Sequence, residues 1–302
     1  MTTLLDRQAM SAPRMIHLRS AGVAIALGLA VTAGGSPTVS ASVPTQSTPV
    51  GPTVAATPSA ITVPRKTITL AAVASGPRLS SIRVVVALGD SVPYGTRCGC
   101  TPYPQDSAAD LATAIHARIR TYNDSVPGYR TSGVLGQLLS NPAAMAHVRA
   151  ANLVEIEIGA NDISYGSGCG TSVACYRPRL SQAMTNLGRI VARVRQLRAG
   201  RPTTIVLLGY WSVWLGGRYA TQRGTAYVNA AAALTRAENT AILGIARRTG
   251  SLYVDLRTAF RGPNDAYDET HLLASDGDHP NAAGHARIGQ ALTQVLRARL
   301  PR

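Results

Sequence analysis

Three short segments of the chain carry side chains that could transfer an acyl group. Ser91 ends a Gly-Asp-Ser run and offers a hydroxyl nucleophile. Asn161, in a Gly-Ala-Asn-Asp run, offers an amide that can donate a hydrogen bond to a developing oxyanion. Asp276 precedes His279 by three residues, so one short loop holds a general base and a carboxylate that can orient it. Together these side chains indicate nucleophilic attack on an ester carbonyl.

Apolar runs precede both the serine and the asparagine and are typical of buried strands. Such runs occupy residues 82–88, 153–158, 204–208 and 252–256. Apolar residues at helical spacing occupy 108–121, 180–197, 226–247 and 282–300. Because strands and helices alternate, we predict an α/β protein, a three-layer α/β/α sandwich with a mostly parallel central sheet. Sites in open parallel sheets form at the carboxyl ends of the strands, where Ser91 and Asn161 would lie.

The order of these motifs resembles that of the SGNH hydrolases, also called the GDSL family of esterases and lipases. The resemblance covers most of the chain, from about 82 to 300, and implies the flavodoxin-like SGNH hydrolase fold. It implies that Ser91 is the nucleophile, that His279 is the general base and that Asp276 orients this base. It also implies an oxyanion hole formed by the backbone amides of Ser91 and Gly128 and by the side chain of Asn161.

The chain departs from the family pattern near two of these residues. Val92 follows the serine where the family name implies leucine, at a position that does no chemistry. Gly133 lies close to Gly128, so both glycines are candidates for the second backbone donor.

The resemblance implies a carboxylic ester hydrolase that forms an acyl-enzyme on Ser91. Substrates of the family include short-chain esters, lipid esters and acetylated sugars, and no motif selects among them. An O-acyltransferase needs the same side chains, and a non-catalytic polysaccharide- or lipid-binding domain of the cell envelope is a further alternative. The sequence contains no Gly-x-Ser-x-Gly, the nucleophile motif of the α/β-hydrolases, which removes the main rival hydrolase fold.

We expect no metal or organic cofactor, because the serine mechanism requires none. A metal site built from Asp276, Asp278, His279 and His285 is the weaker alternative. His285 falls within the last predicted helix, and the sequence holds no His-Glu-x-x-His motif.

Aromatic residues gather after the predicted strand at 204–208. Tyr210, Trp211 and Trp214 stand out because aromatic residues make up only 5% of the chain. We predict that they lie at the catalytic edge of the sheet, where they could line an acyl or sugar pocket. Packing beneath the adjacent glycines at 216–217 is an equally good interpretation.

The first 41 residues have the pattern of a secretory signal peptide. Arg14, His17 and Arg19 form a basic region, residues 21–33 form an apolar run, and a Val-Ser-Ala cleavage site ends at Ala41. The apolar run of about 13 residues is shorter than the roughly 20 that span a bilayer, so an uncleaved anchor is the weaker alternative. We expect a secreted protein, extracellular or in the cell envelope, with a Pro/Thr/Ser/Ala-rich linker at 42–80 and the hydrolase domain at 81–302.

Four cysteines, Cys98, Cys100, Cys169 and Cys175, are candidates for disulfides because thiols of exported proteins tend to pair. Pairing of Cys169 with Cys175 would close a short glycine-rich loop, whereas a Cys98–Cys100 ring would be cramped. Pairing between the two segments therefore stays open. A zinc site is the alternative, although Cys-x-Cys and Cys-x5-Cys differ from the usual ligand spacing.

Composition and charge exclude several classes of protein. The 302 residues are 45% hydrophobic and 15% charged, which rules out a disordered chain, a collagen-like repeat and a coiled coil. The net charge is +15, but Lys66 is the only lysine and no zinc-finger spacing or aromatic RNA-binding motif occurs, so no nucleic-acid partner is expected. The expected partner is a small-molecule, lipid or acylated-sugar ester. We expect a monomer without a stable membrane span once the signal is cleaved.

Overall fold

The structure is a computed structural model that describes residues 77–166 and 168–302. These residues belong to one compact unit of the chain, Thr67–Arg302. The predicted signal peptide and nearly all of the predicted linker lie outside the described residues. The packed part of the described chain begins at Leu79, which is buried and whose backbone amide donates to the carbonyl of Pro301 near the other end of the chain (2.9 Å).

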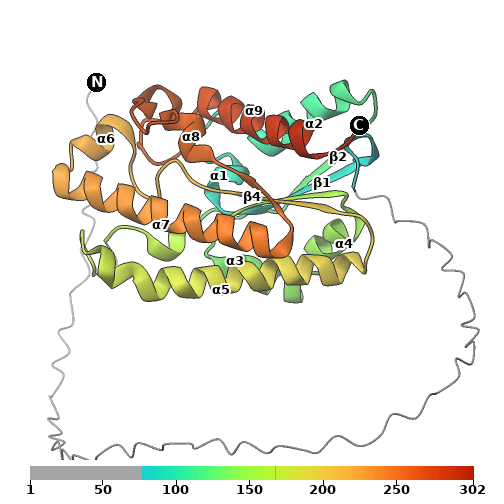
Figure 1. Cartoon of the computed structure of the whole chain (residues 1–302), viewed down its shortest axis with the longest axis horizontal. Helices are drawn as coiled ribbons and strands as arrows, with labels where there is room; N and C mark the ends of the chain where they lie inside the picture. The colour runs from blue at the N-terminus through green and yellow to red at the C-terminus, as the bar shows by residue number, and fades with distance from the viewer. Residues whose placement is uncertain (1–76, 167) are drawn as a thin grey trace, which may run out of the picture. The chain divides into compact units, whose positions relative to one another are not determined.

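A parallel sheet forms the centre of the fold (Figure 1). Its five described strands lie in the order β2-β1-β3-β4-β5, and every neighbouring pair is parallel. The strands are β1 (Val84–Gly89), β2 (Arg120–Asn123), β3 (Leu153–Glu157), β4 (Thr204–Leu208) and β5 (Leu252–Val254). This arrangement confirms the predicted α/β class and parallel sheet, and it leads the ends of β1 and β3 to the same edge of the sheet.

Helices cover both faces of the sheet, which confirms the predicted three layers. Side chains of α2, α8 and α9 join the cluster on one face, those of α3 and α4 join the cluster on the other face, and α5 and α7 contribute to both clusters (Figure 1). The α-helices are α1 (Ser91–Tyr94), α2 (Tyr103–Ala114), α3 (Thr131–Ser140), α4 (Pro142–Ala150), α5 (Val173–Arg198), α6 (Gly217–Thr221), α7 (Thr225–Thr249), α8 (Leu256–Arg261) and α9 (Ala282–Arg299). Three short 3-10 helices are η1 (Leu79–Ser81), η2 (Ala160–Ile163) and η3 (Glu269–Leu272).

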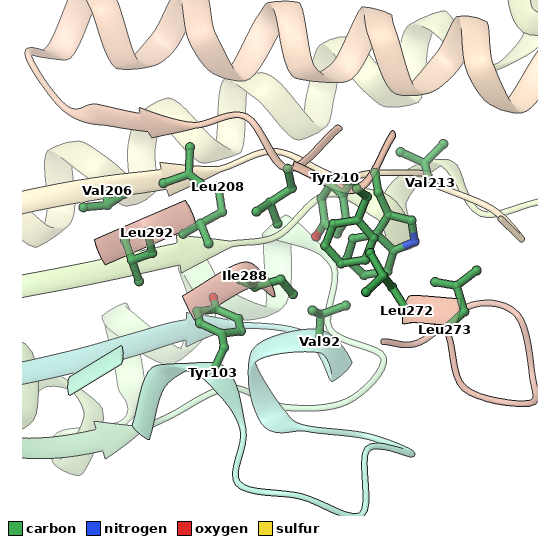
Figure 2. Close-up of a cluster of buried hydrophobic side chains, with 14 of the residues drawn as sticks. Val92, Tyr103, Val206, Leu208, Tyr210, Val213, Leu272, Leu273, Ile288 and Leu292 are labelled. Carbon is green, nitrogen blue, oxygen red and sulfur yellow. The ribbon is translucent and has the colours of Figure 1, made fainter. Parts of the chain in front are cut away.

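Two hydrophobic clusters sandwich the sheet. Val85 of β1 packs in one cluster and Val86 in the other, because successive strand residues point to opposite faces. Figure 2 shows part of the first cluster, in which Leu208 of β4 lies among side chains that include Ile288 and Leu292 of α9. Burial on both faces explains why β1 and β4 have nearly continuous apolar sequences, whereas β3, which is also fully buried, carries two buried glutamates, Glu155 and Glu157.

Several predicted boundaries were wrong. The predicted helix at 108–121 ends at Ala114, and its last two residues belong to β2, a short edge strand that is polar and half-exposed. The predicted strand at 252–256 ends at Val254, because Asp255 accepts a hydrogen bond from the backbone of Thr258 (3.0 Å) and so caps α8. Helices α3, α4, α6 and α8 were not predicted.

Within the described residues, every helix is too short or too polar to cross a bilayer.

Candidate active site

The serine stands at a tight turn between β1 and α1. Gly89 ends the strand, and a Cβ atom there would lie 2.2 Å from the carbonyl oxygen of Glu157, so no side chain fits. Ser91 is the first residue of α1 and half-buried, and it lines a cavity of about 310 Å³. The turn therefore presents the hydroxyl of Ser91 at the carboxyl end of β1, as predicted.

Two hydrogen bonds of the buried Asp90 side chain hold this turn in place. Its Oδ1 accepts a hydrogen bond from the backbone of Val92 (3.0 Å), and its Oδ2 accepts one from the hydroxyl of Tyr210 (2.8 Å). Burial raises the pKa of Asp90 to about 6, although both hydrogen bonds act in the opposite direction. The residue before Ser91 thus carries a buried carboxyl group that links the end of β1 to α1 and to the segment after β4.

His279 and Asp276 form a contact within one loop between η3 and α9. Nδ1 of His279 lies 2.8 Å from Oδ2 of Asp276, while Oδ1 accepts backbone hydrogen bonds from His279 and Asp278 (3.1 Å each). Burial alone would raise the pKa of Asp276, but the hydrogen bonds from His279 and Asp278 hold it below its ordinary value. An ionised Asp276 therefore orients the ring, leaving Nε2 available as a base.

Asn161 lies in η2, immediately after β3, and lines the same cavity as Ser91 and His279. Its Nδ2 donates to the carbonyl oxygen of Tyr129 (2.9 Å), which fixes the orientation of the amide. Asp162 ties the same loop to α3, because its carboxylate accepts from the hydroxyl and the backbone of Thr131 (2.8 and 2.9 Å). The contact with Tyr129 acts through a backbone carbonyl, so no residue type in the sequence could have revealed it.

Gly128 precedes Tyr129 in this anchored segment, but it is exposed and is not among the residues that line the cavity. The amide of the alternative, Gly133, already donates to the carbonyl of Arg130 (2.9 Å) at the start of α3. Between the two glycines, Gly128 remains the better candidate for a backbone donor.

The three aromatic residues after β4 are mainly structural. Tyr210, Trp211 and Trp214 border the cavity, yet their exposed fractions are only 1%, 1% and 3%. Trp211 stacks on Phe260 with 4.6 Å between ring centroids, and Nε1 of Trp214 donates to the carbonyl of Ile163 (2.8 Å). Packing is therefore their principal role, and only a small part of each side chain is exposed to a ligand in the cavity.

The outer wall of the cavity contains residues that the sequence did not single out as a group. They are Tyr165, Arg223 and Tyr227, of which Tyr165 is 39% exposed. Arg97 is a further addition, because its Nε lies 3.8 Å from Oδ2 of Asp276. The contact of Arg223 with both tyrosines leaves no sequence pattern, because Tyr165 lies far along the chain from Arg223 and Tyr227.

The cysteines pair within their own segments, Cys98 with Cys100 and Cys169 with Cys175. The cross-pairing that the sequence left open is not formed.

Among the described residues, the one cluster of metal-binding side chains is Cys98, Cys100 and His285, with ligand atoms within 4.8 Å of one another, and its two sulfurs are joined in the disulfide. His285 is buried, and its Nδ1 accepts a hydrogen bond from the backbone of Tyr103 (3.2 Å), so it does not gather with Asp276, Asp278 and His279.

Comparison with known proteins identifies the family of the chain. Residues 87–287 match the model of the GDSL-like lipase/acylhydrolase family. The chain belongs to this family. The match contains Ser91, Asn161, Asp276 and His279, and it confirms the predicted resemblance to the GDSL esterases and lipases. No curated protein sequence matches the chain.

Solved structures share the fold of this GDSL protein at low sequence identity. The lipase Lip_vut3 from a goat rumen metagenome is 18% identical, with a TM-score of 0.57 over 73% of this chain and 99% of its own. Axe2, an acetylxylan esterase from Geobacillus stearothermophilus, is also 18% identical, with a TM-score of 0.51 over 76% of this chain and 98% of its own. TesA is 20% identical, with a TM-score of 0.50 over 72% and 99%. At these identities the likeness establishes a common fold.

Proposed function

We propose that the protein hydrolyses carboxylic esters through an acyl-enzyme on Ser91. The observation that carries the proposal is the 2.8 Å contact between Asp276 and Nδ1 of His279, in a loop where His279 lines one cavity with Ser91 and Asn161. A nucleophile, a base with its orienter and an oxyanion donor are the groups that this chemistry needs. Membership of the GDSL family supports an esterase or lipase activity.

The reaction proceeds in two halves. In the first, His279 takes the proton of Ser91 while the serine oxygen bonds to the ester carbonyl carbon. The carbonyl oxygen becomes an oxyanion, which the amide of Ser91 and Nδ2 of Asn161 stabilise. Collapse of this intermediate breaks the bond to the alcohol, which leaves with the proton from His279. In the second half, His279 deprotonates a water that attacks the acyl-enzyme, and release of the acid restores Ser91.

The cavity favours a small acyl group. Its volume of about 310 Å³ lies at the lower end of the range for ligand pockets, roughly 300–1,000 Å³. Buried side chains of Tyr210, Trp211 and Trp214 close its floor, so it does not continue into the hydrophobic core. We therefore place short-chain esters ahead of long-chain lipids as substrates.

A series of p-nitrophenyl esters from acetate to palmitate tests this proposal on the chain from residue 42 onward. We expect the highest kcat/KM for a short acyl chain and no hydrolysis by the Ser91→Ala variant. Release of nitrophenol by Ser91→Ala at the wild-type rate would contradict the assignment of the nucleophile. Acyl transfer to an added sugar without release of free acid would instead favour an O-acyltransferase.

We also propose that the protein is exported. The two disulfides support this proposal, because such bonds persist in oxidising compartments outside the cytosol. Expression of the full chain in a bacterium with a secretion pathway should yield a mature form in the medium or envelope that begins near Ser42. N-terminal sequencing of that form provides the check, and a full-length cytosolic product would contradict it.

A further inference from the structure

One charged side chain of the cavity takes no part in the catalytic steps. Arg223 lies in the turn between α6 and α7 and is exposed, yet it lines the same cavity as Ser91 and His279. Its guanidinium carbon stands 5.4 Å from the ring centroid of Tyr165 and 5.5 Å from that of Tyr227. These distances are within the range of cation–π attraction, so two rings hold the cation at the rim of the cavity.

The two rings are themselves fixed by the fold. Tyr165 and Tyr227 meet edge to face with 4.8 Å between centroids, and each also packs against Trp214, at 5.0 and 5.1 Å. The hydroxyl of Tyr227 accepts a hydrogen bond from the backbone of Leu215 (3.0 Å). Arg223 therefore stands on a rigid aromatic support, and a ligand that binds it need not first order the side chain.

No acidic side chain neutralises this cation. Within the described part of the chain, Arg223 forms no ion pair. The acidic residues of the cavity are Asp90, which is bonded to Tyr210, and Asp278, which stands beside His279 on the catalytic loop and does not pair with Arg223. The cavity is thus lined by Asp278, next to His279, and by Arg223, a cation without an acidic partner among the described residues.

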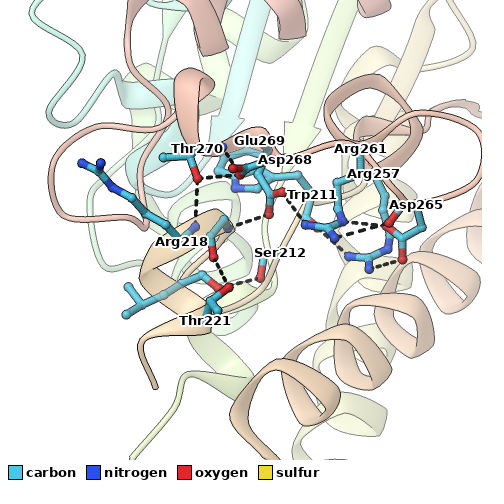
Figure 3. A network of polar contacts seen from close by, with 12 residues as sticks. Trp211, Ser212, Arg218, Thr221, Arg257, Arg261, Asp265, Asp268, Glu269 and Thr270 are labelled. Carbon is cyan, nitrogen blue, oxygen red and sulfur yellow. Dashed lines mark hydrogen bonds and ion pairs between the residues drawn. The ribbon is translucent and has the colours of Figure 1, made fainter. Parts of the chain in front are cut away.

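Two arginines of the neighbouring cavity, Arg257 and Arg261, behave differently. Figure 3 shows Arg257 and Arg261 gathered at Asp265, and Arg261 also contacts Glu269. Those guanidinium groups are occupied by carboxylates of the protein itself. Arg223 is free for a carboxylate or phosphate from outside, which guanidinium groups bind through charge-assisted hydrogen bonds.

We infer that Arg223 forms a subsite for an anionic group of the ester substrate, a carboxylate or a phosphate. This inference rests on the proposed function and adds to it a substrate class, namely esters that carry a negative charge away from the scissile bond. The charge would bind at Arg223 while the ester carbonyl lies at Ser91. Arg223 then acts as a specificity-determining residue, and it takes no part in bond making.

The test compares matched anionic and neutral esters. One pair places the charge on the acyl side, mono-p-nitrophenyl glutarate against p-nitrophenyl pentanoate. A second places it on the alcohol side, 4-acetoxybenzoate against its methyl ester, and 4-acetoxyphenyl phosphate replaces the carboxylate by a phosphate. For each pair the measured quantity is the ratio of kcat/KM for the anionic ester to that for the neutral ester.

We expect Arg223→Gln to lower this ratio about tenfold for at least one anionic ester, and Arg223→Lys to restore part of it, because a lysine keeps the charge but loses the fork of donors. Added salt should reduce the wild-type ratio. Arg218→Gln is the matched control. Arg218 is also exposed and stands 5.1 Å from a tyrosine ring, that of Tyr219, but it lies at the neighbouring cavity. An unchanged ratio in Arg223→Gln, or an equal fall in Arg218→Gln, overturns the inference.

Binding to the Ser91→Ala variant separates this inference from the proposed function. Calorimetric titration with 4-acetoxybenzoate and its methyl ester needs no turnover. Tighter binding of the anion that disappears in Ser91→Ala/Arg223→Gln supports the subsite even if the wild type hydrolyses none of these esters. Equal binding of the two ligands, or no binding of either, overturns it.

Discussion

The side chain of Asp90 connects Ser91 to the core of the protein. One carboxylate oxygen holds the amide of Val92 at the start of α1, and the other receives the hydroxyl of Tyr210 from the segment after β4. Both partners are buried, so water cannot replace either hydrogen bond if it is lost. The position of Ser91 therefore depends on the hydrogen bonds of the buried side chain that precedes it.

Tyr210→Phe should destabilise the protein, because it leaves a buried carboxylate oxygen of Asp90 without its donor. We expect the free energy of unfolding to fall by about 1–3 kcal/mol, measured by urea denaturation. Tyr94→Phe is the control, since Tyr94 is 54% exposed and its loss should change stability little. Equal stability of Tyr210→Phe and wild type would show that the 2.8 Å contact contributes nothing.

Asn161→Ala should lower kcat by about 10²–10³, because one donor to the oxyanion disappears. The loss should fall mainly on kcat and less on KM, since this hydrogen bond strengthens in the transition state. Circular dichroism and melting temperature must be close to wild type, so that the loss reflects catalysis. An unchanged kcat would remove Asn161 from the oxyanion hole.

The loop after β3 packs closely against a side chain of α7. Gly159 has φ of 145°, and a Cβ atom there would lie 2.1 Å from Oε1 of Glu238. Only glycine can adopt this positive φ and also fit beside the carboxyl group of Glu238. The carboxyl group of Glu238 thereby sets where η2, and with it Asn161, can stand.

Gly159→Ala should therefore lower the free energy of unfolding by about 1–3 kcal/mol. It should also reduce kcat, because the loop that carries Asn161 must shift. Gly188→Ala is the control, since Gly188 lies inside α5 with no atom within 4 Å of its added Cβ. We expect this control to gain up to about 1 kcal/mol, as alanine is the better helix former. Thermal unfolding and kcat of both variants are the measurements, and equal values for the two would contradict the expected clash.

The sequence predicts the central elements of this fold better than its edges. Strands β1 and β4 are buried on both faces and consist mostly of apolar residues that are easy to recognise, and β3 keeps enough apolar residues beside its two buried glutamates to be recognised as well. Strand β2 lies at an edge with Arg120 exposed, and its four residues are too few to show a period, so it was not predicted and its first two residues were assigned to a helix. Helices α3 and α4 are short and were overlooked for the same reason.

The sequence likewise predicts only part of the candidate active site. Ser91, Asn161, Asp276 and His279 were predicted because their chemistry resides in the side chain and each follows a strand or precedes a helix. The contact of Asn161 with the carbonyl of Tyr129 and that of Arg223 with Tyr165 were not, because a backbone contact and a contact between distant segments leave no pattern in the sequence. The burial of Trp211 was likewise undecided until its stacking on Phe260 was visible.

For the whole molecule, buried titratable groups define the range of pH in which the fold is stable. Burial raises the pKa of Glu155, Glu157 and Glu238 well above 4.5 and that of Asp90 from 3.8 to about 6. Between the ordinary and the raised pKa, the unfolded chain releases a proton that the folded chain keeps, so these groups cost stability as pH rises through that window. Burial lowers the pKa of His285 from 6.5 to about 4, so stability falls as pH drops from 6.5 to 4.

Glu238→Gln should flatten the decline of stability above about pH 4.5, because a neutral amide cannot release the proton. The melting temperature between pH 4 and 9 is the measurement, and the gain over wild type should increase with pH. Asp110→Asn, at an exposed position of α2, controls for the change in net charge. Parallel curves for wild type and Glu238→Gln would show that Glu238 ionises equally in the folded and unfolded chains.

The residues of the proposed mechanism lie far apart in the sequence. Ser91 follows β1, the first described strand, whereas Asp276 and His279 precede α9, the last described helix. A chain in the course of synthesis or translocation therefore presents Ser91 long before Asp276 and His279 exist. Under the proposed mechanism, ester cleavage can begin only after the segment at 276–279 has emerged and packed, so a partly made chain is inactive.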